Sequence, residues 1–149
     1  MVDYCFLLCY HSYVSVRLKG IYRHQVDEKM RIRIPAKFKT QIGDNPFICA
    51  GDSGVLFVYP RDEGAKILDE AYEGITVSAL SAPKEKLKEA RLISAYAIDA
   101  DEDNQGRILL SQDLLKHASI QKNIVTIGAH ARLEIWSEEK WEEYVNGDS

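Results

Sequence analysis

Apolar and basic residues alternate in the short stretch Arg31-Ile32-Arg33-Ile34, which ends at Pro35. A period of two predicts a strand with both isoleucines on the buried face and both arginines on the exposed face. Residues 21–26 predict the strand before it, and a turn opened by Asp27 joins the two. This strand–turn–strand unit is the pattern around which the rest of the chain is organised.

A short helix and a hairpin follow this unit. Pro35 suits the first helical position, Phe38 and Ile42 share one helical face, and Gly43 lies just past the predicted end. Two apolar strands are then predicted at 47–50 and 55–59. The sequence Gly51-Asp52-Ser53-Gly54 between them is typical of a hairpin.

Two helices are predicted in the middle of the chain. The first opens at residues 60–63, with acidic residues in its first turn, and ends at Gly74. Its predicted buried stripe consists of Ile67, Leu68, Ala71 and Tyr72. A linker at 78–83 leads to a charged helix over 84–96.

The strand–turn–strand unit then recurs. Asp103, Arg107 and Ile108 follow their counterparts Asp27, Arg31 and Ile32 at a constant offset of 76 residues. The second copy predicts a strand at 107–110, with Ser111 as the N-cap of a helix whose apolar face is Leu114, Leu115 and Ala118. The chain therefore contains two copies of one structural unit.

The second hairpin also has a counterpart in the first. Residues 124–127 correspond to 47–50, and residues 133–136 correspond to 56–59. Ser137 is placed to cap a last helix, with Trp141, Tyr144 and Val145 predicted to be buried. Each half is thus predicted to run strand, turn, strand, short helix, hairpin, helix.

These patterns predict an α+β fold that is mainly β: an internally duplicated small β-barrel with short peripheral helices. The predicted boundaries are a first repeat at 18–77, a linker and middle helix at 78–97, and a second repeat at 98–149. Residues 1–17 fit neither repeat, and we interpret them as an over-extended start site, with a real extra strand as the alternative. A half of this size buries too little apolar surface to be stable alone.

Charge is distributed unevenly. The formal net charge is −4, yet the segment from Arg17 to Lys39 holds eight basic and two acidic residues, a net charge of +6. A basic face on an acidic body suits an anionic partner held at one place. No apolar run approaches the roughly 20 residues of a membrane-spanning helix, so no membrane partner is expected.

Enzymatic and metal-binding functions find little support. The three cysteines, Cys5, Cys9 and Cys49, include no CxxC pair, and no histidine lies at zinc-finger spacing. Buried, unreactive thiols and a reducing cytoplasm are therefore expected. The sequence contains no nucleophile elbow, P-loop, dinucleotide fingerprint or HExxH motif, so we expect no catalysis, cofactor or metal.

The chain resembles the MraZ family of bacterial transcriptional regulators, within the AbrB-like swapped-hairpin barrel superfamily. The resemblance covers residues 18 to about 141. The residues that carry it are Gly20-Ile21-Tyr22-Arg23-His24, Asp27, Lys29, Arg31, Ile34, Pro35, Val58-Tyr59-Pro60, Arg91, Asp103, Gln105-Gly106-Arg107-Ile108, Leu110 and Leu133-Glu134-Ile135-Trp136. Two DxxxR turns at this spacing are a far more specific match than one.

The resemblance implies a swapped-hairpin barrel that assembles into a ring of about eight or more subunits. It implies binding of double-stranded DNA at short direct repeats in the promoter of the division and cell-wall gene cluster, with repression as the expected direction of control. The protein is then cytoplasmic and nucleoid-associated.

The resemblance also assigns roles to the motif residues. Arg31, with Lys29 and Arg33, is expected to contact DNA, while Asp27 orients Arg31. Asp103 and Arg107 form the second candidate pair. Because Asp101, Glu102 and Asp103 crowd Arg107 with negative charge, a structural or ring-interface role is favoured for Arg107 over a DNA contact.

The chain departs from the family pattern at four places. Met30 stands where the first turn usually has glycine, a residue that tolerates positive φ. Glu102 replaces an apolar residue, and Ser111 replaces a proline. Phe57 and Glu134 differ within otherwise matched strands.

Two other readings remain open. In the first, Arg31 has no role in DNA binding and only forms a local salt bridge with Asp27, which contributes at most about 1 kcal/mol if it is exposed. The whole chain can instead be an antidote-like module of the same superfamily that binds a protein through its acidic helices. Binding that weakens steeply with salt would favour the DNA-binding function.

Arg23 and Lys37 are expected to be surface charges, and His24 a half-buried, hydrogen-bonded side chain.

Overall fold

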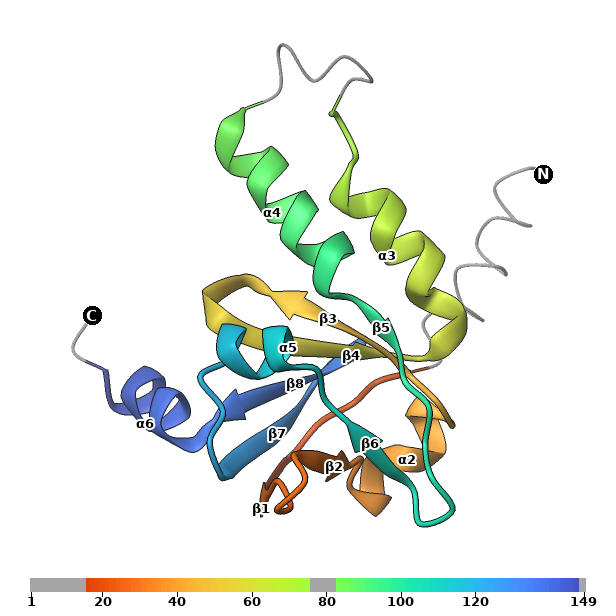
Figure 1. Cartoon of the computed structure of the whole chain (residues 1–149), viewed down its shortest axis with the longest axis vertical. Helices are drawn as coiled ribbons and strands as arrows, with labels where there is room; N and C mark the ends of the chain where they lie inside the picture. Colours follow the sequence, from red (N-terminus) through yellow and green to blue (C-terminus); the bar gives the residue numbers. More distant parts are fainter. Residues whose placement is uncertain (1–15, 76–82, 148–149) are drawn as a thin grey trace.

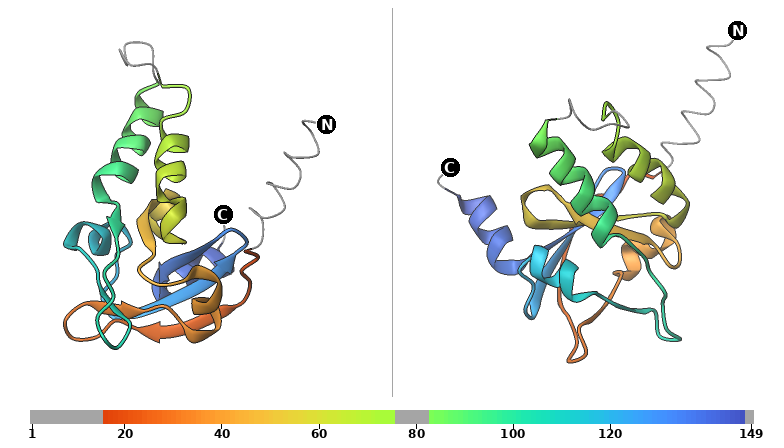
Figure 2. Two further views of the ribbon diagram at one scale, coloured as in Figure 1. Left: turned by 90° about the vertical axis from the view of Figure 1, so that its right-hand side faces the viewer. Right: turned by 45° about the horizontal axis from the view of Figure 1, so that its top comes forward.

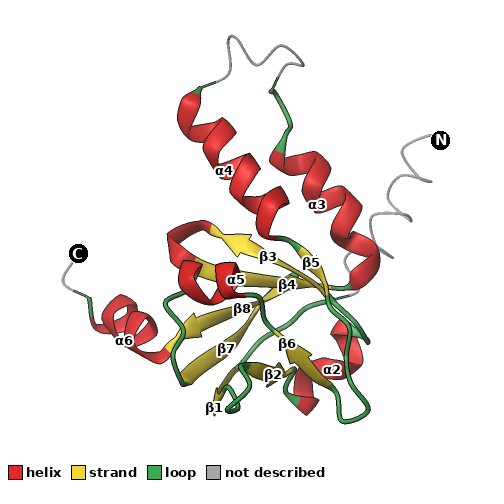
Figure 3. Cartoon of the chain, viewed as in Figure 1, coloured by secondary structure: helices red, strands yellow, loops and turns green. Residues whose placement is uncertain are grey.

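The computed structural model describes residues 16–75 and 83–147. The strands are all paired antiparallel, in a six-stranded sheet of order β1-β7-β8-β4-β3-β5 and a separate two-stranded ribbon of β2 and β6 (Figures 1 and 3). Their bounds are Ile21–Gln25 (β1), Arg31–Arg33 (β2), Phe47–Gly51 (β3), Val55–Tyr59 (β4), Ile98–Asp99 (β5), Arg107–Leu109 (β6), Asn123–Ala129 (β7) and Arg132–Ser137 (β8). The fold is mixed α/β and mainly an antiparallel sheet.

Five α-helices surround the sheet within the described ranges. They are Ala36–Ile42 (α2), Gly64–Ala71 (α3), Lys84–Tyr96 (α4), Gln112–His117 (α5) and Glu138–Asn146 (α6). Helices α3 and α4 pack side by side and project from the sheet at the end opposite the β2–β6 ribbon (Figures 1 and 2). Helix α6 lies beyond the ends of β7 and β8 (Figure 1). The ribbon is therefore left uncovered by these three helices.

Strand pairing joins the two halves of the sequence. β1 pairs with β7, and β5 pairs with β3, so each leading strand lies against the hairpin of the other half. β4 also pairs with β8, with Phe57 opposite Glu134. The halves consequently share one sheet and cannot be separated without breaking it.

The core beneath the ribbon draws matched residues from both halves. Ile32 of β2 and Ile108 of β6 face each other and are buried, as are Phe38 of α2 and Leu114 of α5. These side chains fill the space between the ribbon, the two short helices and the sheet. The predicted alternation of buried and exposed side chains is confirmed. The isoleucines point inward, and their positions determine which side chains face outward.

Most predicted elements are confirmed. The strand at 55–59 and the helix at 84–96 have the predicted bounds, and the predicted strands at 31–34 and 107–110 each end one residue earlier. Ser111 and Ser137 both cap helices, accepting hydrogen bonds from the backbone N–H groups of Leu114 and Lys140.

The burial predicted for two helices is wrong in part. On α6, Tyr144 is 69% exposed and Val145 is 57% exposed. This helix contacts the sheet through Trp141 and one side of the Tyr144 ring, which both pack against Trp136. On α3 the predicted stripe is only half-buried, and Tyr72 is exposed because it lies past the last turn, where its hydroxyl bonds Ser94.

Some predictions lie outside the described residues. Cys5, Cys9 and the first fifteen residues of the proposed extension are among them, as is most of the linker at 78–83. Leu18, where the first repeat is predicted to begin, is buried and bridges His130 of the β7–β8 hairpin.

Candidate nucleic-acid interface

The first Asp–Arg turn is organised by one carboxylate. Asp27 Oδ1 accepts hydrogen bonds from the backbone N–H groups of Lys29 and Arg31, each at 2.9 Å. Asp27 Oδ2 accepts a bond from Arg31 Nε at 2.7 Å. The aspartate therefore fixes both the backbone of the turn and the direction of the arginine side chain.

The second turn repeats this geometry. Asp103 Oδ1 accepts from the backbone N–H groups of Gln105 and Arg107 at 2.9 Å, and Asp103 Oδ2 accepts from Arg107 Nε at 2.7 Å. Both turns also close with the same pair of backbone hydrogen bonds between aspartate and the residues three and four positions on. The two copies of the motif thus have the same local structure.

Both turns require a left-handed residue at the same position. Met30 has a φ of 62° and its counterpart Gly106 has a φ of 75°. Glycine adopts this conformation freely, whereas methionine pays a steric cost of about 1 kcal/mol. The Met30 side chain packs against the core, which offsets part of that cost. The departure from glycine therefore leaves the turn geometry intact.

Hydrogen bonding also sets the ionisation of the two aspartates. Chiefly the backbone N–H of Arg107, helped by that of Gln105 and by the Arg107 side chain, lowers the pKa of Asp103 to about 2. The backbone N–H of Arg31 likewise lowers the pKa of Asp27. Hydrogen bonds to a carboxylate favour its charged form. Both acids are consequently ionised at neutral pH and hold their arginines in place.

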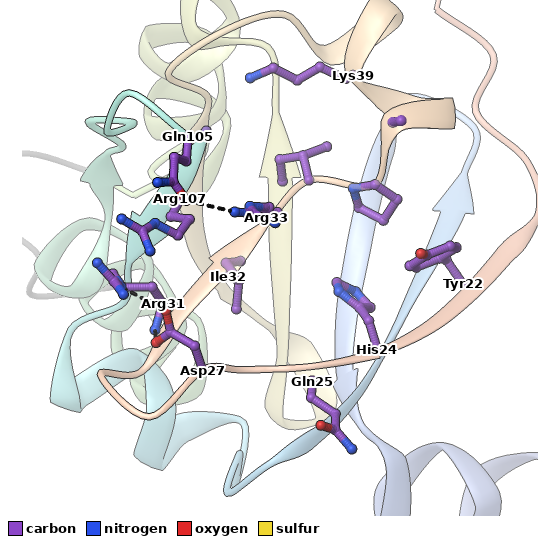
Figure 4. Close-up of a pocket in the computed structure, with 14 residues that line it drawn as sticks. Tyr22, His24, Gln25, Asp27, Arg31, Ile32, Arg33, Lys39, Gln105 and Arg107 are labelled. Atoms are coloured by element: carbon purple, nitrogen blue, oxygen red, sulfur yellow. Dashed lines mark hydrogen bonds and ion pairs between the residues drawn. The ribbon is translucent and has the colours of Figure 1, made fainter.

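The β2–β6 ribbon brings the two turns together. Arg31 lies opposite Leu109, Ile32 opposite Ile108 and Arg33 opposite Arg107. Contacts also cross between the copies: Arg31 Nη1 lies 3.7 Å from Asp103 Oδ2, and Arg33 Nη2 donates to Gln105 Oε1 at 3.2 Å. Figure 4 shows Arg31, Arg33 and Arg107 gathered on one side of a cavity.

A cavity of about 630 Å³ lies beside this cluster. Tyr22 and His24 of β1 line it across from the arginines (Figure 4). His24 Nε2 is hydrogen-bonded to Thr126 Oγ1 at 2.7 Å, and burial lowers the pKa of the histidine. His24 is thus a half-buried, hydrogen-bonded residue, as the sequence predicts.

Other basic residues of the N-terminal segment are engaged within the chain. Arg23 pairs with Glu142 of α6 at 2.8 Å, and Lys37 Nζ donates to the carbonyl of Ile21 at 2.8 Å. Both therefore serve as surface charges, as predicted. Of the other basic residues in this segment, Arg17, Lys19, Lys29 and Arg33 are exposed and Arg31 is half-buried.

The negative charge of Glu102, which was predicted to crowd Arg107, is compensated by another residue. The Glu102 carboxylate bonds to the Lys39 ammonium group and accepts the backbone N–H of Asn45 at 2.7 Å. Its side chain is only 10% exposed. A charge compensated in this way adds little to the field at Arg107, whose own aspartate partner is Asp103.

Sequence reasoning did not single out Leu109 or Gln105 as parts of this surface. The offset of 76 residues, applied beyond the motif, would have located both, since it maps Arg33 onto Leu109 and Lys29 onto Gln105. The second copy thus supplies one apolar and one neutral polar side chain where the first supplies two cations.

Residues 16–75 and 83–147 contain neither a candidate metal cluster nor a candidate membrane-spanning helix. No group of three or more histidine, cysteine, aspartate or glutamate side chains is arranged to hold a metal ion there. No helix in these ranges is long and apolar enough to span a bilayer. Cys49 is buried, and burial raises the pKa of its thiol to about 12, so it is unreactive as predicted.

Comparison with known proteins agrees with the twofold motif. The family model described as "MraZ protein, putative antitoxin-like" matches residues 18–80 and 93–149. A protein named transcriptional regulator MraZ from Clostridium acetobutylicum is 41% identical over 125 residues, which cover 84% of each chain. Proteins of the same name from Thermoanaerobacter pseudethanolicus and Oenococcus oeni are each 38% identical, over 87% and 86% of both chains respectively.

These relatives are named for transcriptional regulation and not for a catalytic activity. The matched residues include both Asp–Arg turns and all eight strands of the fold. The chain therefore belongs to the MraZ family of transcriptional regulators.

Proposed function

We propose that this chain regulates transcription by binding double-stranded DNA through the β2–β6 ribbon. The observation that carries the proposal is the side-by-side placement of two identical Asp–Arg turns on one uncovered surface. In this proposal Arg31, Lys29 and Arg33 contact DNA and Asp27 orients Arg31. Arg107 and Asp103 form the second, less basic half of the same surface.

The shape and chemistry of the ribbon suit DNA. The major groove of B-form DNA admits a two-stranded β-ribbon, and arginine reads guanine through bidentate hydrogen bonds to O6 and N7. Asp27 engages Nε of Arg31, and the contact of Nη1 with Asp103 Oδ2 is long at 3.7 Å, so the terminal nitrogens of the guanidinium group can form such a pair. Lys29 and Arg33 on either side suit neighbouring phosphates, which position a protein without specifying sequence.

The family resemblance supports a more detailed proposal. The chain would form a swapped-hairpin barrel with repeats at 18–77 and 98–149, joined through 78–97. It would assemble into a ring of about eight or more subunits that binds short direct repeats in the promoter of the division and cell-wall gene cluster. Covering that promoter would repress it, and the protein would be cytoplasmic and nucleoid-associated.

A gel shift of the full-length protein on its own upstream promoter tests the proposal. Arg31→Ala is expected to lower affinity at least 100-fold, since the loss recurs in every engaged subunit. Arg107→Ala is expected to retain measurable binding, because its copy lacks flanking cations. Arg23→Ala is the matched control: it removes an equal charge outside the ribbon and should bind like the wild type.

Salt concentration varied in the same series adds an independent readout, because phosphate contacts make affinity fall steeply with salt. Specific binding by a folded Arg31→Ala protein at wild-type affinity would overturn the proposed interface. If the folded wild-type protein binds no promoter DNA, the antidote-like alternative is favoured. In that case the exposed Tyr144 and Val145 on the acidic helix α6 would be the first candidate surface for a protein partner.

A further inference from the structure

The surface of the β2–β6 ribbon contains an apolar side chain that is largely exposed to solvent. Leu109 is 64% exposed, although its neighbours Ile108 and Leu110 are 1% and 2% exposed. Successive side chains of a strand point to opposite faces, so burying Ile108 and Leu110 forces Leu109 outward. A polar side chain could also occupy this outward-facing position of the strand, yet the residue there is a leucine.

The strand register puts Leu109 among the arginines. It lies directly opposite Arg31, just as Arg107 lies directly opposite Arg33. The outward face of the ribbon therefore presents three guanidinium groups and one apolar side chain. By the offset of 76 residues, Leu109 occupies the position that Arg33 holds in the first copy. The apolar side chain is thus the point at which the two halves of this surface differ most.

The ribbon holds Leu109 firmly. The adjacent N–H of Leu110 donates to the carbonyl of Met30 at 3.3 Å, and Arg31 opposite is fixed by Asp27. Isolated exposed leucines are common on protein surfaces and need no explanation. This one lies at the end of β6, directly opposite Arg31, on a backbone held at both strands, where a nucleic acid bound to the ribbon would cover it.

Base edges in the major groove offer one apolar group, the C5-methyl group of thymine. We propose that Leu109 is a specificity-determining residue that packs against the methyl group of a thymine beside the base pair contacted by Arg31. This inference rests on the proposed function. It assigns the two halves of the ribbon different tasks, with guanine read by arginine and thymine read by leucine.

Spacing places the thymine close to the guanine. Residues directly opposite each other in an antiparallel pair have Cα atoms about 4.5–5.5 Å apart. Successive base pairs are stacked about 3.4 Å apart. Leu109 and Arg31 should therefore reach bases within about two steps of each other. A sequence that holds a guanine and a thymine at that separation is the expected target.

Deoxyuridine substitution tests the inference, because it removes only the methyl group and leaves every hydrogen-bonding group of thymine. Wild-type protein is titrated with the bound promoter duplex and with duplexes in which each thymine in turn is replaced by deoxyuridine. At one thymine near the essential guanine, affinity should fall about fourfold, the loss expected for one buried methyl-sized group. The Leu109→Ala protein should bind the two duplexes equally.

Val145→Ala is the matched control, since Val145 is also an exposed apolar residue but lies on α6, away from the ribbon. It should retain the wild-type preference for thymine. If wild-type protein shows Arg31-dependent binding that is indifferent to every thymine methyl group, the inference is wrong and the proposed function stands. If wild-type protein binds no promoter duplex, both are wrong.

A change in oligomeric state on Leu109→Ala substitution, measured by light scattering, would also overturn the inference. It would place Leu109 in a contact between subunits.

Discussion

At the residue scale, each Asp–Arg turn depends on the negative charge of one aspartate. Asp103 has a folded-state pKa of about 2, below the ordinary aspartate pKa of 3.8. Its contribution to stability is therefore complete above about pH 4 and is lost as the pH falls towards 2, because the unfolded chain binds the proton first. Asp27, whose pKa is lowered for the same reason, acts in the same direction.

Asp103→Asn tests this dependence. The amide keeps an oxygen that can accept the backbone hydrogen bonds, but it cannot titrate. The thermal midpoint of the wild-type protein should fall as the pH is lowered from 5 to 2.5, and the fall should be smaller for Asp103→Asn and smaller still for the double variant with Asp27→Asn. Equal slopes for all three proteins would show that the turns do not govern acid stability.

Individual residues of the turns were largely predictable from sequence. Alternation placed Ile32 inside and Arg33 outside, and the glycine usual at position 30 signalled a left-handed residue, which Met30 proves to be. Partners distant in sequence were not predictable. The sequence predicted negative charge from Glu102 near Arg107, but not that Lys39, 63 residues away in the chain, compensates this charge.

At the scale of elements, Glu102 joins the segment before β6 to the region between α2 and β3. Its carboxylate holds Lys39 at the end of α2 and the N–H of Asn45, whose side chain accepts the N–H of Glu102 in return at 2.8 Å. Glu102→Ala removes this largely buried carboxylate and leaves both donors without their acceptor. The substitution should lower the free energy of unfolding by about 2 kcal/mol. Urea denaturation measures this loss.

Asp44→Ala is the control, because Asp44 also pairs with Lys39 but is 81% exposed. Exposed pairs contribute little, so it should change stability by less than about 1 kcal/mol. Equal losses for the two variants would mean that the charge of Lys39, and not the buried link between elements, sets the effect.

Helix α6 illustrates what sequence periodicity leaves open. Its spacing of Trp141, Tyr144 and Val145 correctly predicted a helix with an apolar stripe, and Ser137 correctly predicted its start. Whether another element covers the stripe depends on where the helix lies, and α6 extends past the ends of β7 and β8 (Figure 1). The rings of Trp141 and Tyr144 pack against Trp136, with centroids 5.2 Å and 5.0 Å from it, while much of Tyr144 and Val145 stays exposed.

At the scale of the whole molecule, the net charge of −4 opposes binding to DNA except at the basic ribbon. One ribbon offers few phosphate contacts, so a single subunit should bind weakly. In the proposed ring, neighbouring subunits engage successive repeats, and each further contact forms at a high effective concentration. Affinity should then depend on how many repeats lie within reach.

Promoter duplexes of equal length with one, two or three intact repeats test this dependence. Affinity should rise at least tenfold from one repeat to three, and the dependence on salt should steepen as more phosphates are engaged. Inserting about five base pairs between repeats is the control, because half a helical turn moves the next repeat to the opposite face of the duplex. That insertion should cancel the gain. If affinity depends neither on the number of repeats nor on their helical phase, one subunit supplies all of the binding and the proposed ring has no part in recognition.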